Sequence, residues 1–310
     1  PIVRYGQQAP QLDPCGQARC VSADRFCYGI KRLVLGLAKK AIIADQLALI
    51  YAKVAAVPAA TLPAPILVLG YTAYMMQLYF DFSGYSDMAI GIGEFFGITL
   101  PENFDYPYLA CSVGEYWRRW HISLSGWFRD YVYIPLGGSR CRLRRTCLNL
   151  LIVFTLTGLW HGAAWQYVMF GLLHGVILCL ERLGLGQLLS QLPKFFRHLY
   201  TVVVLWATLI IFGAPGLREG LAAWRGILTW QNGARGYTLA AFADTKLLLI
   251  LAVSFLLCGP LQALSPRLKK ALYERNAPSP AGMVLLLVLL FLGLMRVTAG
   301  TYSAFIYFQF

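Results

Sequence analysis

The chain has 310 residues, of which 58% are hydrophobic and 13% charged, and its 27 basic and 14 acidic residues give a formal net charge of +13. Soluble domains carry about 25% charged residues, so the composition excludes a single water-soluble domain, as well as a disordered chain, a collagen and a coiled coil, which need polar or strictly periodic sequences. The basic residues lie in short clusters between apolar runs, which favours cytoplasmic loops and contact with membrane lipid over nucleic acid, and we predict an all-α, polytopic transmembrane helical bundle that binds no nucleic acid.

The N-terminal segment contains three of the eight cysteines, Cys15, Cys20 and Cys27. No histidine lies near them and no CxxC pair is present, so we predict free thiols and no metal site. The chain begins with Pro1 and shows no signal-peptide pattern. We therefore expect residues 1–310 to be the C-terminal portion of a single membrane domain whose N-terminal helices are missing.

Membrane-spanning helices are expected where about 20 apolar residues follow one another. Ile30–Val57 is amphipathic and is predicted to lie partly in the membrane interface. Val54–Phe80 has no charged residue, but its prolines delay the predicted helix start to about Ala64. Later spans are predicted over Leu199–Leu217, Leu247–Pro266 and Asn276–Met295.

A first polar cluster follows the uncharged run, where Asp81 and Asp87 flank the hydroxyl groups of Ser83 and Tyr85. Ionisable side chains at membrane depth are costly, which indicates a functional role. The alternative interpretation is that the two carboxylates hydrogen-bond the local backbone or an arginine and fix a helix break. Polar chain at this depth must be enclosed by protein or line a water-filled cavity.

A second cluster covers residues 114–131, which mix aromatic and charged side chains. On one continuous helix, Trp117, Trp120, His121 and Leu124 would share a face. Arg118 is then placed to meet anionic lipid or the phosphate of an acyl donor, and tryptophans suit the membrane interface. The alternative is an amphipathic interfacial helix with no reactive role.

A third cluster lies within Thr146–Leu180, a stretch free of Asp, Glu, Lys and Arg that follows the basic residues Arg140–Arg145. The stretch is too long for one crossing, so we predict two helices that meet around His161–Ala164. A histidine there can exchange a proton near neutral pH, and the adjacent Gly162 lets a substrate approach the backbone. A packed structural histidine is the alternative for His161 and the role expected of His174.

Three long motifs carry a resemblance to a known family: YFDFSGYSDMAIGIGEFFGITLPENFDYPY, EYWRRWHISLSGWFRDYVYIPLGGSR and LTGLWHGAAWQYVMFGLLHG. In this order they resemble the membrane-bound O-acyltransferases (MBOAT), and most nearly the bacterial proteins of AlgI type that act in alginate O-acetylation. The teichoic-acid D-alanyl transfer proteins are more distant. The terminal Phe305–Phe310 also resembles the end of AlgI-type chains. The start of the chain departs from the family, whose members have several earlier membrane helices.

The resemblance implies a fold and a set of site residues. Family members have re-entrant and interfacial helices around a tunnel through a thinned membrane core. Their catalytic histidine, in the WHG motif, falls on His161, and the second family histidine falls on His121. The supporting substrate-binding residues that the motifs suggest are Asp81, Ser83, Tyr85, Asp87, Trp117, Arg118, Trp120, Ser123 and Trp160.

The resemblance also implies a reaction and its partners. We expect an acetyl group to move from a cytoplasmic thioester, acetyl-CoA or an acylated carrier, across the bacterial inner membrane to an exopolysaccharide such as alginate, with periplasmic acetyltransferase-like proteins as partners and no bound cofactor. His161 as general base would contribute about 10²–10⁴-fold, while His121 would orient the donor or stabilise the oxyanion. The alternatives are an acyl-group transporter and a scaffold that supplies a periplasmic acetyltransferase.

Overall fold

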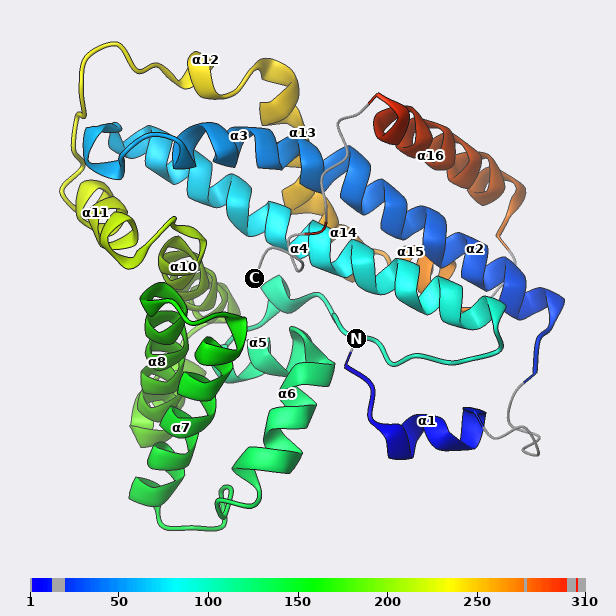
Figure 1. Ribbon diagram of the computed structural model, residues 1–310, viewed down its shortest axis with the longest axis horizontal. Coiled ribbons are helices and arrows are strands. Elements are labelled where there is room, and N and C mark those ends of the chain that lie inside the picture. The colour runs from blue at the N-terminus through cyan, green and yellow to red at the C-terminus, as the bar shows by residue number, and fades with distance from the viewer. Residues whose placement is uncertain (1, 13–19, 276–277, 300–304, 306–310) are drawn as a thin grey trace. The chain divides into compact units, whose positions relative to one another are not determined.

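The computed structural model describes residues 2–12, 20–275, 278–299 and 305. These residues form helices, turns and irregular segments, and none of them belongs to a β-strand, so the predicted all-α class is confirmed (Figure 1). The chain divides into two compact units, which are described separately below. The first unit comprises Pro1–Leu47, Met76–Asp105 and Ile250–Gln309, and the second comprises Ala48–Met75, Tyr106–Leu249 and Phe310.

The helices of the first unit come mainly from the start of the chain and from its last 60 or so residues. The helices within this unit are α1 (Tyr5–Leu12), α2 (Ala23–Ala38), the π-helical η1 (Lys39–Ala44), α14 (Pro260–Leu264), α15 (Pro266–Tyr273) and α16 (Pro280–Thr298). Three helices run from one unit into the other: α3 (Asp45–Ala55), α4 (Ala64–Phe95) and α13 (Thr245–Leu257). Helix α4 begins at Ala64, as predicted from the prolines before it.

Two glycine pairs bring helices α2 and α4 into backbone contact. A Cβ atom added to Gly36 would lie 2.5 Å from the carbonyl oxygen of Gly84, and one added to Gly91 would lie 2.6 Å from that of Gly29. Only residues without a side chain allow such an approach, as at the close helix crossings of membrane proteins. The crossing places the polar residues between the paired glycines opposite one another.

Two basic residues of Ile30–Val57, Arg32 and Lys40, lie inside this unit, which corrects the interfacial position predicted for this part of the segment. Arg32 and Lys40 are each 1% exposed. Arg32 pairs with Asp87, which also accepts from Lys39 Nζ at 2.6 Å, and Lys40 Nζ lies 2.9 Å from Asp45. A buried charge is tolerated only when it is paired. The basic side chains that make this segment look amphipathic are therefore paired with acidic side chains of the same unit.

Helix α4 continues through the first polar cluster without a break. It runs for 32 residues to Phe95, so the predicted helix break at Asp81 and Asp87 is wrong. Both carboxylates are instead satisfied by basic side chains of the same unit: Asp81 lies 2.5 Å from Lys40 Nζ. The part of that interpretation that gave Asp87 an arginine partner is confirmed, because Arg32 bonds it.

The second unit contains the remaining helices. They are η2 (Ala59–Thr61), η3 (Pro107–Leu109), α5 (Val113–Arg119), α6 (Ile122–Phe128), η4 (Arg129–Tyr133), α7 (Leu143–His161), α8 (Trp165–Leu180), η5 (Glu181–Leu185), α9 (Gly186–Ser190), α10 (Lys194–Gly213), α11 (Leu217–Leu228) and α12 (Leu239–Phe242). Helices α7 and α8 pack side by side as a hairpin (Figure 1). Their meeting point at His161–Ala164 confirms the prediction for the uncharged stretch.

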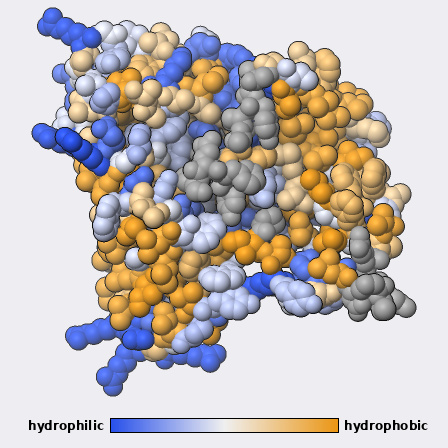
Figure 2. All heavy atoms as spheres, viewed as in Figure 1, coloured by the Kyte–Doolittle hydropathy of each residue, from blue (hydrophilic) through white to orange (hydrophobic). Residues whose placement is uncertain are grey.

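Four helical stretches are long and apolar enough to cross a membrane: Trp165–Ser190, Lys194–Gly213, Thr245–Leu264 and Pro280–Thr298. The first comprises α8 and the η5 and α9 helices that follow it. The other three correspond to the spans predicted over Leu199–Leu217, Leu247–Pro266 and Asn276–Met295. Helix α16 leaves large apolar side chains outside, such as Phe291, which is 64% exposed. Figure 2 shows apolar residues over α16 and over the α7–α8 hairpin. The chain is a membrane protein.

The cysteines within the described residues are free thiols, as predicted. Cys15 lies outside the described residues, and so do residues 306–310 of the terminal motif.

Candidate active site

His121 lies at a break between α5 and α6, which corrects the prediction of one continuous helix. Its φ and ψ of 45° and 54° are left-handed, a conformation that ends a helix and is uncommon for a residue other than glycine. The imidazole Nδ1 accepts the backbone N–H of Leu124 at 3.4 Å and so caps the N-terminus of α6. This N-cap replaces the continuation of α5, and it fixes the ring against the start of the next helix.

Helix α5 is capped by a carboxylate from another part of the second unit. Glu181 accepts the backbone N–H of Val113 at 2.7 Å and that of Gly114 at 3.0 Å, and Ser112 Oγ accepts the N–H of Glu115 at 3.0 Å. The first N–H groups of a helix have no partner within the helix and attract negative charge. Glu181 follows α8 in the chain, so it ties α8 to the segment that carries His121.

The two family histidines both contact one tryptophan ring. The ring centroids of His121 and Trp160 are 6.0 Å apart, and those of Trp160 and His161 are 5.0 Å apart. His161 is the last residue of α7 and is partly exposed, and the ring of Phe212 lies 5.0 Å from its own. The structure therefore brings His121, His161 and Trp160 together within the second unit.

The imidazole of His121 is buried and stays neutral. It is 2% exposed, and burial, followed by the nearby His161, lowers the pKa of His121 to about 3. Because Nδ1 accepts a hydrogen bond from Leu124, the single proton of the neutral ring is on Nε2. His121 thus presents a hydrogen-bond donor and not a base.

Gly162 is partly exposed at the turn between α7 and α8. A Cβ atom added there would lie 2.8 Å from the ring of Tyr167, so the space beside this glycine is filled. Its φ of 152° is one that other residues rarely adopt. Gly162 therefore serves the turn between α7 and α8, and the approach of a substrate to its backbone stays a prediction.

His174 lies in the interior of α8, as predicted for a packing residue. It is 1% exposed, and its Nδ1 lies 3.0 Å from the carbonyl oxygen of Phe170, to which it donates. The Trp117 ring packs edge-on at 5.2 Å.

The other predicted residues of the second cluster lie near His121 with different exposures. Trp117 and Trp120 are 9% and 7% exposed, so they form a packed core and not an interfacial belt. Ser123 is partly exposed in the first turn of α6, and Arg118 is exposed on α5. Further along the same cluster, Trp127 and Tyr131 are 38% and 57% exposed, so the interpretation as an amphipathic interfacial element stays an alternative for that part of the cluster.

The residues of the first cluster belong to the other unit. Asp81 and Asp87 are 1% and 3% exposed and bond basic side chains there, and Ser83 is 2% exposed. Tyr85 is partly exposed, with its ring 5.2 Å from that of Phe305. Their supporting role toward a substrate stays a prediction.

Two sets of contacts are not indicated by any local sequence motif. Glu181 is the first charged residue after the uncharged stretch, and no local pattern indicates that it bonds an N-terminus 68 positions earlier in the chain. In the first unit, the amphipathic pattern predicts an interfacial position for Arg32 and Lys40, although a basic residue within an apolar helix can also mark a buried partner for acidic residues.

Known proteins resemble this chain over most of its length. The model of the MBOAT, membrane-bound O-acyltransferase family, matches residues 1–222. The probable alginate O-acetylase AlgI of Pseudomonas putida is 36% identical over 100% of this chain and 66% of its own length. The peptidoglycan O-acetyltransferase of Helicobacter pylori is 33% identical over 100% of this chain and 61% of its own. A teichoic acid D-alanyltransferase of Bacillus subtilis is 35% identical over 50% of this chain and 41% of its own. The chain thus spans two thirds or less of the length of these three relatives.

Proposed function

Because the chain belongs to the membrane-bound O-acyltransferase family, we propose that it moves an acetyl group from a cytoplasmic thioester donor across the bacterial inner membrane for the O-acetylation of an exopolysaccharide such as alginate. The names of its relatives support O-acylation: two O-acetylate polysaccharides, alginate and peptidoglycan, and one transfers D-alanine to teichoic acid. The observation that carries the proposal is that His121 and His161 both contact the Trp160 ring, with centroid distances of 6.0 and 5.0 Å.

The two histidines divide the chemistry between base and hydrogen-bond donor. His161 is partly exposed at the end of α7, so an acceptor hydroxyl can reach it. His121 is buried and neutral with its proton on Nε2, which suits it to stabilise developing negative charge. An uncharged donor and a separate base avoid the repulsion that two imidazolium ions at this spacing would suffer.

The transfer follows from these roles. His161 takes the proton of the acceptor hydroxyl while the oxygen attacks the carbonyl carbon of the thioester. The carbonyl oxygen becomes an oxyanion, which His121 Nε2–H stabilises. The tetrahedral intermediate then collapses with cleavage of the C–S bond, and the thiolate takes the proton from the His161 imidazolium. His161 therefore returns to its neutral state after each turnover.

The donor is acetyl-CoA or an acylated carrier, and the exposed Arg118 three residues before His121 is the basic side chain best placed for its phosphate. The Arg140–Arg145 cluster is less suited to this role. It adjoins the start of α7, and His161 ends that 19-residue helix, which at about 1.5 Å per residue is roughly 28 Å long. Lipid anchoring on the cytoplasmic side suits that cluster better.

The protein is proposed to be a multi-pass protein of the bacterial inner membrane that needs no bound cofactor. Periplasmic acetyltransferase-like proteins are the proposed partners, and they complete delivery of the acetyl group to the polymer. The four apolar helices support crossing of the membrane.

The test uses the full chain reconstituted in liposomes with labelled acetyl-CoA or acylated carrier on one side. We expect His161→Ala to abolish thioester cleavage and acetyl transfer. His174→Ala is the matched control, since it removes a histidine that packs against Phe170, and it should retain turnover in its folded fraction. Movement of acetyl label without thioester cleavage would support a transporter instead. A polysaccharide that is acetylated in cells carrying both His121→Ala and His161→Ala would support a scaffold.

A further inference from the structure

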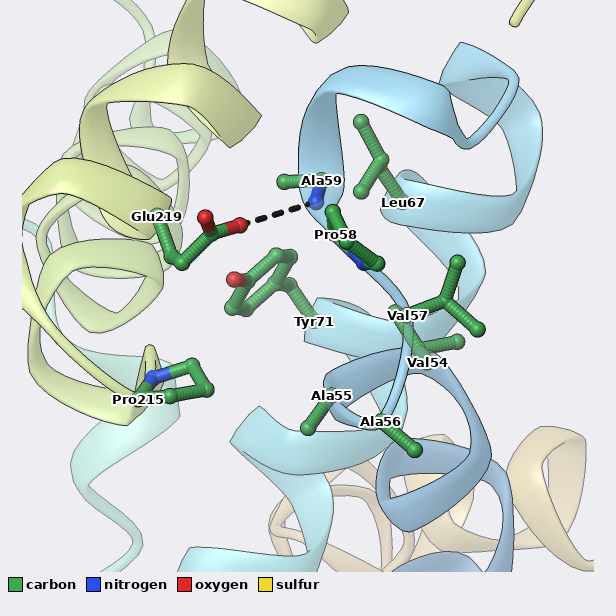
Figure 3. A pocket seen from close by; sticks show the side chains of 10 residues that line it. All are labelled: Val54, Ala55, Ala56, Val57, Pro58, Ala59, Leu67, Tyr71, Pro215 and Glu219. Atoms are coloured by element: carbon green, nitrogen blue, oxygen red, sulfur yellow. Dashed lines mark hydrogen bonds between the residues drawn. The ribbon is translucent and has the colours of Figure 1, made fainter. Parts of the chain in front are cut away.

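A small cavity lies in the second unit between the end of α3, the start of α4 and α11 (Figure 3). Its volume is about 200 Å³, less than the 300–1,000 Å³ that is typical of sites for drug-sized ligands. The lining is mainly apolar, from alanine, valine, leucine and proline, with Tyr71 of α4 and Glu219 of α11 as its polar side chains. The cavity therefore has room for one small group that carries a few carbon atoms and a polar end.

Glu219 brings a fixed negative charge to this cavity. Its Oε2 accepts the backbone N–H of Ala59 at 2.9 Å, a bond that Figure 3 shows across the cavity. Among the residues that the structure describes, nothing hydrogen-bonds Oε1 of Glu219, and no basic side chain pairs with the carboxylate. Glu219 is partly buried, and a charge removed from water is stable only with a partner of opposite sign. Its second oxygen therefore marks a place for a cation.

Tyr71 supplies a second acceptor on the cavity wall. Its side chain is 4% exposed, and within the described part of the chain no partner bonds its hydroxyl. In Figure 3 this hydroxyl points toward α11, beside the Glu219 carboxylate. Buried polar groups are as a rule hydrogen-bonded, so a phenol that lines a cavity in this way indicates a ligand. A ligand that donates to the Tyr71 oxygen leaves the phenol proton for the neighbouring carboxylate.

The chemistry of the lining favours a primary ammonium group. None of the ten lining residues is Lys, Arg or His. The last turn of α3, which ends at Ala55, presents carbonyl groups and the negative end of the helix dipole. An –NH₃⁺ group has three N–H donors and no acceptor, which matches Glu219 Oε1, the Tyr71 oxygen and a carbonyl group of that turn. A quaternary ammonium would leave these acceptors without a hydrogen bond, and a phosphate or carboxylate would be repelled.

Helix α11, which carries Glu219, has an exposed face of the kind that lies among lipid headgroups. Leu221 and Leu228 are 46% and 83% exposed, and Arg218 and Arg225 are exposed as well. Successive members of this set are three or four residues apart, which places all four on one side of α11. At a membrane surface, leucines of such a helix meet acyl chains while arginines meet lipid phosphates. The ammonium group that this helix encounters is therefore that of a lipid headgroup.

We propose that the cavity between Glu219 and Tyr71, the Glu219–Tyr71 cavity, binds the primary ammonium group of a phosphatidylethanolamine headgroup. The ammonium donates to Glu219 Oε1 and to the Tyr71 oxygen, and its two methylene groups lie against the apolar lining. Because α3, α4 and α11 all contribute to the lining, the bound lipid stabilises the packing of α11 on the other two helices. The lipid site is independent of the proposed acetyl transfer, no step of which uses this cavity.

Lipid retention by the full chain tests the ligand. The protein is reconstituted in nanodiscs that contain phosphatidylethanolamine and phosphatidylcholine in equal amounts and with the same acyl chains. It is then extracted in mild detergent, and the lipids that remain bound are quantified by mass spectrometry. Phosphatidylcholine is the matched lipid, because it has the same net charge but its ammonium has no N–H. The wild type should retain phosphatidylethanolamine about tenfold over phosphatidylcholine, the effect of one or two hydrogen bonds to a charged group.

Two isosteric variants link this preference to the cavity. In Glu219→Gln the amide oxygen can still accept from Ala59, while its NH₂ group turns a donor into the cavity. Tyr71→Phe removes the hydroxyl and leaves the Ala59 bond intact, so it remains informative if the first variant does not fold. Each should lose the preference for phosphatidylethanolamine. The matched control is Asp244→Asn, since Asp244 also accepts a backbone N–H, from Leu247, outside the cavity, and it should retain the lipid as the wild type does.

A titration with ethanolammonium chloride tests the headgroup alone, with potassium chloride as the matched salt and the unfolding midpoint of the delipidated chain in detergent as the readout. Ethanolammonium should raise the midpoint of the wild type and of Asp244→Asn, and it should have no such effect on Glu219→Gln or Tyr71→Phe. Equal retention of the two lipids by the wild type would overturn the lipid site. An undiminished preference for phosphatidylethanolamine in both folded variants would do the same. A potassium effect as large as that of ethanolammonium would overturn it in favour of an inorganic cation site.

Discussion

The carboxylate of Glu181 accepts the backbone N–H of Val113 at 2.7 Å, across 68 positions of the chain. The same carboxylate accepts the backbone N–H of Gly114, so the side chain that follows α8 caps the first two N–H groups of α5. Helix α5 leads directly to His121, and α8 packs on the helix that ends in His161. Glu181 therefore positions the two histidine-bearing segments relative to each other.

Removing the Glu181 carboxylate should loosen α5. We expect Glu181→Ala to lower the free energy of unfolding by about 2 kcal/mol, since it removes two hydrogen bonds to a charged group at a helix N-terminus. Glu181→Gln should cost less, because its amide oxygen still accepts one of the bonds. Denaturant titration in detergent micelles measures both. Arg182→Gln, a change at the adjacent exposed residue, is the control, and equal stability of Glu181→Ala and this control would contradict the positioning role.

Two substitutions separate the roles of the His121 ring nitrogens. Asn places a polar atom near Nδ1 and tolerates the left-handed conformation, so His121→Asn should keep stability within about 1 kcal/mol of the wild type. It lacks a donor at the Nε2 position, and loss of one oxyanion donor typically costs about 10²–10³-fold in kcat. His121→Gln should retain more activity, because its amide reaches that position, but less stability. A wild-type kcat in His121→Asn would show that His121 does not donate a hydrogen bond to the oxyanion.

The pH dependence of stability should carry the signature of His121, which lies outside the four spanning helices. Burial and then His161 lower its pKa in the folded state to about 3, against about 6.5 in the unfolded chain. The unfolded state therefore binds the proton first, so this residue favours unfolding increasingly as the pH falls from 6.5 toward 3, and the contribution is absent above pH 6.5. The unfolding midpoint should fall less steeply between pH 6.5 and 4 in His121→Asn than in the wild type. Parallel curves would show that His121 is not buried in the folded protein.

The glycine pairs between α2 and α4 predict a sharp steric effect. Gly36→Ala should lower the free energy of unfolding by about 1–3 kcal/mol, because its Cβ would overlap the carbonyl oxygen of Gly84. Gly282→Ala is the matched control in α16, where the added Cβ would meet its nearest atom at an ordinary 3.4 Å. Alanine also has about 1 kcal/mol better helix propensity than glycine. The control should thus be neutral or stabilising, and equal losses in the two variants would show that the helices do not cross this closely.

Asp87→Asn distinguishes a structural role from a substrate role for the first polar cluster. Loss of this carboxylate leaves Arg32 and Lys39 without their shared partner, and breaking a buried pair costs about 3–5 kcal/mol. The free energy of unfolding should fall by that amount, while kcat in the folded fraction stays unchanged. Asp130→Asn is the control, since Asp130 pairs with the exposed Arg129 and such pairs contribute about 0–1 kcal/mol. A folded Asp87→Asn protein without activity would assign Asp87 to substrate binding.

Local patterns in the sequence predicted several of the helices and pointed to the two motif histidines. The uncharged stretch Thr146–Leu180 became the α7–α8 hairpin with its turn at His161–Ala164, and the prolines before Ala64 set the start of α4. Apolar runs and prolines act through the backbone of their own segment, so they can be read without knowledge of the rest of the chain.

Tertiary contacts decided the environment of those residues. The sequence pattern predicts an interfacial position for Arg32, whereas the folded chain buries it against Asp87, 55 positions away. The pattern also predicts a continuous helix through His121, whereas the His121 ring caps the start of α6. Glu181 and the Glu219–Tyr71 cavity likewise depend on residues far apart in the chain. The cost of a buried charge or an unpaired N–H depends on which group lies within hydrogen-bond distance. That distance is a property of the packed chain, and hydropathy and helical periodicity do not encode it.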